Sequence, residues 1–144
     1  MKHLKSLLRI ALISLVLVGA AASFTSCNKS ARTLLLEMSN DLNANCPLQY
    51  DTDVLLTHTT VDRFNFVYIY STNEEYVLQA RSAEGKENIL DALYSTARYD
   101  RDLRYMLEIC YEAGLGIEYR YTDNYGNSSS IIIDPHEIGE ILKY

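Results

Sequence analysis

Few residues of this chain have the types needed for nucleophilic or metal chemistry. After residue 30 the sequence holds two cysteines, Cys46 and Cys110, and two histidines, His58 and His136. A cysteine nucleophile needs a nearby base that is itself oriented by a third group, and neither histidine has a partner at a recognisable spacing. The pattern of a zinc site is also missing. We therefore expect both histidines to be ordinary surface or hydrogen-bonded residues.

Acidic residues occur in close pairs, among them Asp51/Asp53 and Asp100/Asp102. A calcium loop needs a longer series of ligands around a central glycine, and the stretch "DTDVLLTHTTVD" has no such glycine. The sequence contains no phosphate-binding loop, nucleophile elbow or dinucleotide fingerprint. An enzyme whose polar residues come together from distant segments stays open as one of the hypotheses. The sequence predicts a protein that is not an enzyme and that holds no metal and no cofactor.

Tyrosine is the unusual residue type, with 12 copies against three phenylalanines and no tryptophan. Alternation places Tyr68 with Tyr70, and Tyr119 with Tyr121, on one face of a strand. These rings form either a contact surface for a glycan or a protein, or part of the core with their hydroxyls at its rim. Tyr125, at the tip of a hairpin loop, is the candidate that we expect to be most exposed.

The first 26 residues have the composition of a secretion signal. The stretch "MKHLKSLLR" carries Lys2, Lys5 and Arg9 and no acid, and the apolar run "IALISLVLVGAAASF" follows. A basic start and an apolar stretch of this length are typical of a signal peptide, whereas a spanning helix needs about 20 apolar residues. An uncleaved N-terminal anchor is the alternative.

The end of this segment, "SFTSC", resembles the signal of bacterial lipoproteins, in which small residues precede an obligatory cysteine. The leucine usual in that pattern is replaced here by Phe24 or Thr25. The resemblance implies that residues 1–26 are removed and that Cys27 is acylated on its sulfur and on its new amine. Asn28, in place of aspartate, favours the outer membrane, with the domain facing the periplasm. Several acyl chains on one residue anchor a protein firmly, because each buried methylene contributes about 0.8 kcal/mol.

Cleavage before Cys27 makes the remaining chain strongly acidic. Three of the 13 basic residues and none of the 19 acidic residues lie in the signal, which leaves 10 basic against 19 acidic residues, a net charge of −9. Such a chain is a poor ligand for nucleic acid. The acyl groups, rather than a basic patch, must hold it to the membrane. In an oxidising envelope Cys46 and Cys110 can form a disulfide; the alternative is two free thiols packed as small apolar groups.

The rest of the sequence predicts an α+β fold. We expect a helix from about Ser30 to Asn45 and a hairpin of strands at 53–61 and 64–71. The middle region is helical, with a break near Gly85 before the helix "KENILDALYSTAR" and a second helix from about Asp100 to Ala113. A second hairpin contains Ile117, Tyr119 and Tyr121 and returns through "SSIII". A short helix from Pro135 to about Leu142 follows a capping sequence. The expected order is α-β-β-α-α-β-β-α, with the two hairpins forming an antiparallel four-stranded sheet.

We expect the signal at 1–26, the lipidated cysteine and a short tether at 27–32, and one α+β domain at 33–144. The stretches Asn43 to Asp51 and Cys110 to Gly126, with Gly116 and Asp123 in place, resemble small uncharacterised secreted or lipid-anchored bacterial domains. That resemblance implies the fold and no catalytic residue. The leading hypothesis is a lipid-anchored, non-catalytic binding or assembly module with an envelope protein as partner. A lipoprotein that binds a glycan or small ligand through exposed tyrosines is the alternative.

Overall fold

The computed structural model describes residues 29–144. The predicted signal peptide and Cys27 lie outside the described residues. Among the helices of residues 29–144, none has the length and apolar character required to cross a membrane.

The secondary structure follows the predicted order, with one extra strand and one extra helix. The elements are α2 (Ala31–Asn45), β1 (Leu48–Asp51), β2 (Val54–Val61), β3 (Asn65–Thr72), α3 (Glu74–Arg81), α4 (Ala83–Ala97), α5 (Arg101–Ala113), β4 (Gly116–Thr122), β5 (Ser128–Ile133) and α6 (Pro135–Leu142). The helical break in the middle region falls at Ser82, and Gly85 lies inside the first turn of α4.

The helix boundaries are set by local hydrogen bonds. Side-chain oxygens at five N-caps accept a hydrogen bond from a backbone N–H of the first turn: Ser30, Asn73, Ser82, Asp100 and Asp134. Such caps satisfy donors that have no partner inside the helix. The predicted capping box is confirmed, because Glu137 also accepts from the backbone N–H of Asp134 at 2.9 Å. Gly114 ends α5 in the left-handed conformation, with φ of 68°, which glycine adopts without steric cost.

The prediction of an antiparallel four-stranded sheet is wrong in two respects. The sheet has five strands in the order β1-β2-β3-β4-β5, and β3 pairs with β4 in parallel. The other three pairings are antiparallel. The helices α3, α4 and α5 carry the chain from the end of β3 back to the start of β4, and such a crossover produces a parallel pair. The additional strand β1 has only four residues, too few for their alternation to predict a strand.

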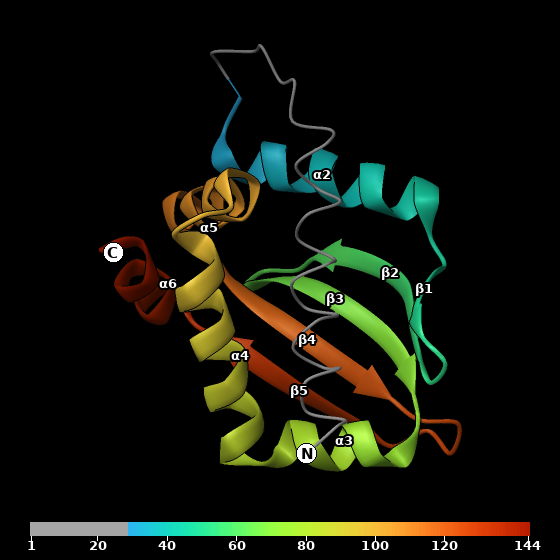
Figure 1. The fold of residues 1–144 in the computed structure, drawn as a ribbon. Coiled ribbons are helices and arrows are strands. Elements are labelled where there is room, and N and C mark those ends of the chain that lie inside the picture. Colours follow the sequence, from blue (N-terminus) through green and yellow to red (C-terminus); the bar gives the residue numbers. More distant parts are fainter. Residues whose placement is uncertain (1–28) are drawn as a thin grey trace.

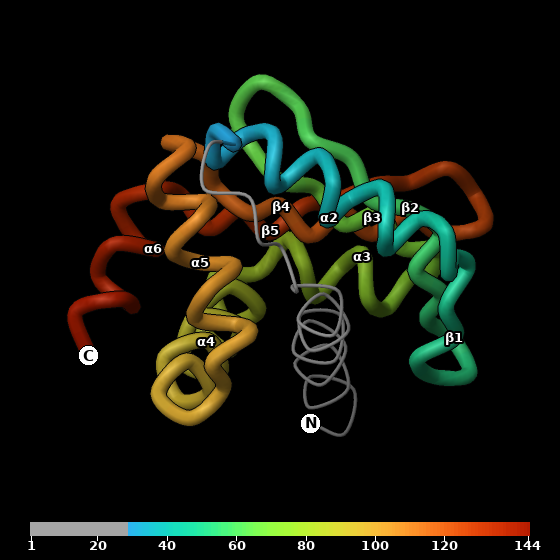
Figure 2. Tube along the Cα trace, turned by 90° about the horizontal axis from the view of Figure 1, so that it is seen from above, coloured from blue at the N-terminus to red at the C-terminus, as the bar shows by residue number. Residues whose placement is uncertain are grey.

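The helices lie on one face of the sheet, as the two perpendicular views show (Figures 1 and 2). Helix α2 contacts β2, α3 contacts β4 and β5, and α5 contacts α2 and α6. The core between sheet and helices includes Phe66, Ile117 and Ile133 from the strands and Leu35 and Leu103 from the helices. The opposite face carries a polar group in which the half-exposed Arg120 donates to Glu118 at 3.0 Å.

Candidate functional site

The four strand tyrosines do not form an exposed platform. Tyr68, Tyr70, Tyr119 and Tyr121 are all 0% exposed and belong to the core. The parallel register sets them side by side, and the ring centroids of Tyr68 and Tyr119 are 5.5 Å apart, while those of Tyr70 and Tyr121 are 5.2 Å apart. Their role is therefore packing, as in the second interpretation, except that the hydroxyls of Tyr119 and Tyr121 are buried rather than at the rim of the core. Tyr125 is 84% exposed, as expected.

The buried tyrosine hydroxyls differ in their partners. The hydroxyl of Tyr68 donates to the sulfur of Met106 at 3.2 Å. The hydroxyls of Tyr119 and Tyr121 are buried and have no hydrogen-bond partner within residues 29–144. Loss of hydration raises the pKa values of the Tyr119 and Tyr121 hydroxyls well above their usual range, so both hydroxyls stay neutral. Each such hydroxyl reduces stability by about 1–3 kcal/mol.

The disulfide predicted as one of two alternatives is not present, and Cys46 and Cys110 are both free thiols. Cys46 follows the end of α2 that leads into β1, whereas α5 meets α2 near its other end (Figure 1). Cys110 is buried in α5, and burial raises its pKa to about 12, so it is a poor nucleophile. Loss of solvation also raises the pKa of Cys46.

The histidines and acids show no catalytic or metal-binding arrangement within the described residues. His136 is 85% exposed at the side chain and lies 3.9 Å from Glu140. His58 is also exposed and contacts the hydroxyl of Thr57 at 3.1 Å. Across residues 29–144, no group of three or more His, Cys, Asp and Glu side chains is placed to hold a metal ion.

Exposed aromatic and arginine side chains gather where α4, α5 and α6 meet. We call this group the tyrosine–arginine surface and define it as Arg98, Tyr99, Arg101, Tyr105 and Tyr144. Tyr99 is 88% exposed and Tyr144 is 72% exposed. The guanidinium carbon of Arg98 lies 6.0 Å from the ring centroid of Tyr144. A shallow depression at the α4–α5 corner is lined by Ser95, Thr96, Tyr99, Asp100, Arg101 and Asp102.

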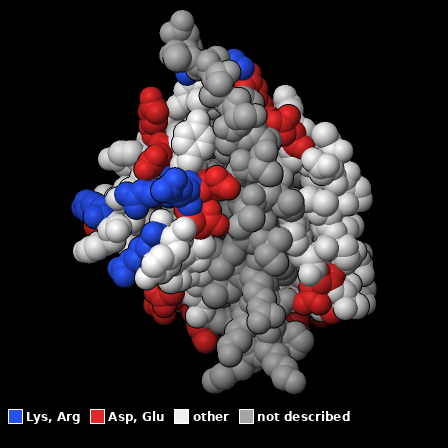
Figure 3. Space-filling model, turned by 45° about the horizontal axis from the view of Figure 1, so that its top comes forward, with Lys and Arg blue, Asp and Glu red and all other residues white. Residues whose placement is uncertain are grey.

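The charge of this surface differs from that of the whole chain. Figure 3 shows Lys and Arg side chains gathered on the side of the molecule that holds α4, α5 and α6, with acidic side chains beside them. Arg104 pairs with Glu108 at 3.3 Å, and Lys143 pairs with Glu140. Arg98 and Arg101, by contrast, form no ion pair with another residue of the range 29–144. Two arginines that form no ion pair therefore lie among exposed aromatic rings, with Asp100 and Asp102 close to Arg101.

The tyrosine–arginine surface was not predicted from the sequence. Tyr99 directly precedes the N-cap Asp100, which places it at a helix–helix corner, and Arg101 and Tyr105 are one helical turn apart on α5. Those two signals could have identified part of it. The contribution of Tyr144 depends on how α6 packs against α4 and α5, which is a tertiary feature.

Comparison with known proteins gives similarity at the level of the fold. No protein family and no curated protein matches the sequence. Among solved structures, a Pseudomonas aeruginosa protein described as secreted shares 14% identity at a TM-score of 0.57, over 75% of this chain and 92% of that one. EpsS, a pilotin from the type 2 secretion system of Vibrio vulnificus, shares 13% identity at a TM-score of 0.51, over 75% of this chain and 91% of that one. At such identities the likeness establishes a common α+β architecture.

Proposed function

We propose that this protein is a lipid-anchored envelope protein that acts as a non-catalytic assembly module, at the outer membrane and facing the periplasm. Two observations support the proposal. The N-terminal segment resembles a lipoprotein signal ending at Cys27, and the fold is similar to that of a secretion-system pilotin and of a secreted protein. The class of partner that this suggests is a protein component of an envelope machine.

The tyrosine–arginine surface is the part of the domain that fits a protein partner best, and this observation carries the proposal. Tyrosine and arginine dominate the energetics of many protein interfaces, because they combine large contact area with polar tips. Neither Arg98 nor Arg101 forms an ion pair with another residue of the described range, and Arg101 shares its depression with Asp100 and Asp102. The partner is therefore a protein segment that carries carboxylate groups, which these two guanidinium groups would bind.

The acyl anchor and the surface would work together. Acylation at Cys27 confines the domain to a membrane surface, which raises its effective concentration toward a partner on the same membrane. The chain between Cys27 and the start of α2 at Ala31 is short, so the domain would stay close to the bilayer. Assembly on the membrane then needs only modest affinity at the tyrosine–arginine surface.

Site-specific photo-crosslinking in cells of the natural host tests the contact. We expect a photoreactive residue at position 99 to give one discrete adduct, and Arg98→Glu combined with Arg101→Glu to abolish it through charge reversal. A photoreactive residue at Leu78, which is 55% exposed on α3, is the matched control. An adduct that is unaffected by the double reversal, or equal adducts at both positions, would overturn the assignment of this surface.

The anchor has its own test. Mass spectrometry of the membrane-extracted protein should find an N-terminal fragment that begins at acylated Cys27. Cys27→Ser should leave an unprocessed precursor without acyl chains. A free N-terminus near Ala22, or an intact Met1, would contradict the lipoprotein interpretation and leave the surface to be tested on its own.

A further inference from the structure

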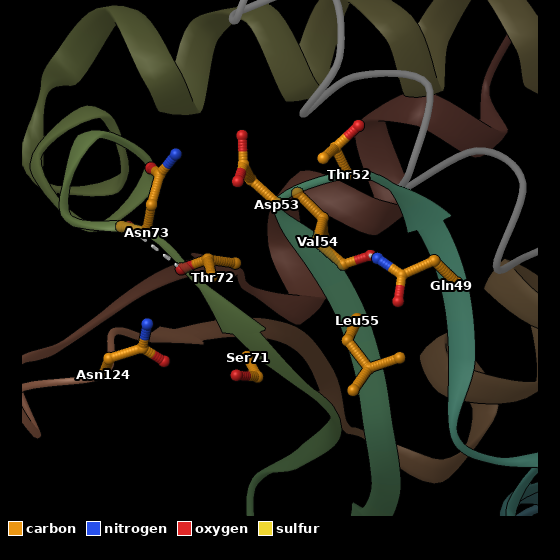
Figure 4. A pocket seen from close by; sticks show the side chains of 9 residues that line it. All are labelled: Gln49, Thr52, Asp53, Val54, Leu55, Ser71, Thr72, Asn73 and Asn124. Carbon is orange, nitrogen blue, oxygen red and sulfur yellow. Dashed lines mark hydrogen bonds between the residues drawn. The ribbon is translucent and has the colours of Figure 1, made fainter.

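A small polar hollow lies at the end of the sheet where β1 turns into β2 (Figure 4). Its volume is about 190 Å³. Three distant parts of the chain contribute to it: the β1–β2 turn, the junction of β3 with α3, and the β4–β5 loop. The lining residues are Gln49, Thr52, Asp53, Val54, Leu55, Ser71, Thr72, Asn73 and Asn124.

Polar atoms available for a ligand converge on this hollow. Asn73 uses its side-chain oxygen to cap α3, accepting from the N–H of Tyr76 at 3.3 Å, which leaves its amide N–H groups as donors. Gln49 donates through its amide nitrogen to the carbonyl of Val54 at 3.3 Å, which leaves its oxygen as an acceptor. Asp53 and Asn124 form no side-chain hydrogen bond with any other residue in the described part of the chain. The hollow thus offers both donors and acceptors.

The charge and size of the hollow narrow the class of ligand. Among its nine lining residues one is acidic and none is basic, which disfavours anions. A single carboxylate falls short of the ligand set of a calcium ion. At about 30 Å³ per water, the volume equals about six waters, which is the scale of one sugar ring and smaller than a pocket for a drug-sized ligand, about 300 Å³ or more. A neutral ligand with several hydroxyl groups fits these limits.

The β4–β5 loop carries Tyr125 directly after Asn124, although Tyr125 itself is not one of the residues that line the hollow. Tyr125 is 84% exposed, and its backbone N–H donates to the carboxylate of Asp123 at 2.9 Å. The same carboxylate accepts from the backbone N–H and the side-chain amide of Asn127, each at 2.9 Å. These bonds hold the loop in one conformation, so that Asn124 and Tyr125 are presented from a fixed tip. Amide, carboxylate and aromatic groups together are suited to the polar edge and the apolar face of a sugar.

We propose that this hollow is a binding site for a neutral sugar unit. Asn73, Asn124 and Asp53 hydrogen-bond the sugar hydroxyls, and the exposed ring of Tyr125, which follows Asn124 outside the lining of the hollow, turns onto the part of the sugar that projects from it. The site lies on the sheet end and the two loops, whereas the tyrosine–arginine surface lies on α4, α5 and α6. Sugar binding therefore does not depend on the proposed assembly role, and either can fail alone.

Nuclear magnetic resonance of the full chain in a detergent without sugar groups tests the proposal. The probes are N-acetylglucosamine and glucose, with glucose 6-phosphate as the anionic comparison. We expect the side-chain amide signals of Asn73 and Asn124 to shift in a saturable way with a Kd in the millimolar range. Glucose 6-phosphate should bind more weakly, because Asp53 repels its phosphate.

Substitutions distinguish specific sugar binding in the hollow from nonspecific contact with the protein surface. Asn124→Ala and Tyr125→Ala should each raise the Kd about tenfold or more, which corresponds to the loss of one good contact. Asp53→Asn should reduce the preference for glucose over glucose 6-phosphate. Tyr99→Ala, which removes an exposed tyrosine far from the hollow, is the matched control and should leave the Kd unchanged. No saturable shift up to about 50 mM sugar, or an equal Kd in Asn124→Ala, would overturn the proposal.

Discussion

The side chain of Asn43 hydrogen-bonds to both backbone polar groups of Thr59. Its amide nitrogen donates to the carbonyl of Thr59 at 2.9 Å, and its oxygen accepts from the N–H of Thr59 at 2.7 Å. Strand β1 pairs with β2 only from Val54 to Leu56, so Thr59 has no strand neighbour on that side. Asn43 of α2 therefore takes the place of a missing strand. This explains the first of the two asparagines in the stretch "NANCP".

Removal of this side chain should destabilise the domain strongly. We expect Asn43→Ala to lower the free energy of unfolding by about 2–3 kcal/mol, because it leaves a buried N–H and C=O without partners. Urea denaturation measures this change. Asn45→Ala, on the exposed side of the same helix, is the matched control and should change stability by about 0.5 kcal/mol or less. Equal effects of the two substitutions would contradict the role assigned to Asn43.

Gly116 has no room for a side chain. A β carbon at this position would lie 2.6 Å from the carbonyl oxygen of Ile133 and 2.6 Å from the side-chain oxygen of Asn65. Because the Ile133 carbonyl belongs to the neighbouring strand, it cannot move without distorting the sheet. We expect Gly116→Ala to cost about 2–4 kcal/mol of folding free energy.

A second glycine provides the comparison. A β carbon at Gly139 would lie 2.8 Å from the ring of Tyr111, but that ring is 54% exposed and can swing away. Gly139→Ala should therefore cost about 1 kcal/mol or less. If denaturation showed the reverse ranking of the two glycines, the argument from the fixed carbonyl would be wrong.

Asp123 should make the β4–β5 loop sensitive to acid. The hydrogen bond from the Asn127 side chain, with further bonds from backbone N–H groups, lowers the pKa of its carboxyl. A group whose pKa is lower in the folded state stabilises the fold above its unfolded pKa, and this contribution disappears as the pH falls through the folded pKa. We expect the Tm of the wild type to drop in the acid range below pH about 4. Asp123→Asn should lower the Tm at neutral pH and weaken the dependence of the Tm on pH. Asp53→Asn is the control, because the Asp53 side chain has no hydrogen-bond partner among the described residues, and it should change neither the Tm at neutral pH nor its pH dependence.

The two described cysteines should react only slowly with thiol reagents. Burial raises the pKa of Cys110 to about 12, so both the thiolate fraction and access are small at neutral pH. We expect Cys46 to react first in the native protein and Cys110 only after addition of denaturant. Cys46→Ala should remove the faster phase and leave the slower one unchanged. A two-dalton rise in mass on reduction would instead reveal a disulfide and contradict the free thiols of the structure.

Local sequence predicted most of the secondary structure correctly. The capping residues Ser30, Asp100 and Asp134, the proline after α2 and the glycine after α5 each act on the backbone within a few residues, so their effects can be read without knowledge of the fold. The predicted helix 30–45 and the C-terminal helix agree with the structure to within one or two residues. The short strand β1 lacked such a signal, whereas the break between α3 and α4 was expected near Gly85 and falls at Ser82.

The sequence alone determined the helices, the two hairpins, the acidic charge and the lipoprotein-like end of the signal, because composition and short-range hydrogen bonding specify them. Only the tertiary structure decided the parallel pairing of β3 with β4, the burial of the strand tyrosines and the contact of Asn43 with Thr59. It also decided that Asp53, Asn73 and Asn124 meet in one hollow. These features join residues that are far apart in the chain. Such contacts depend on how the helices pack against the sheet, which short-range patterns do not specify.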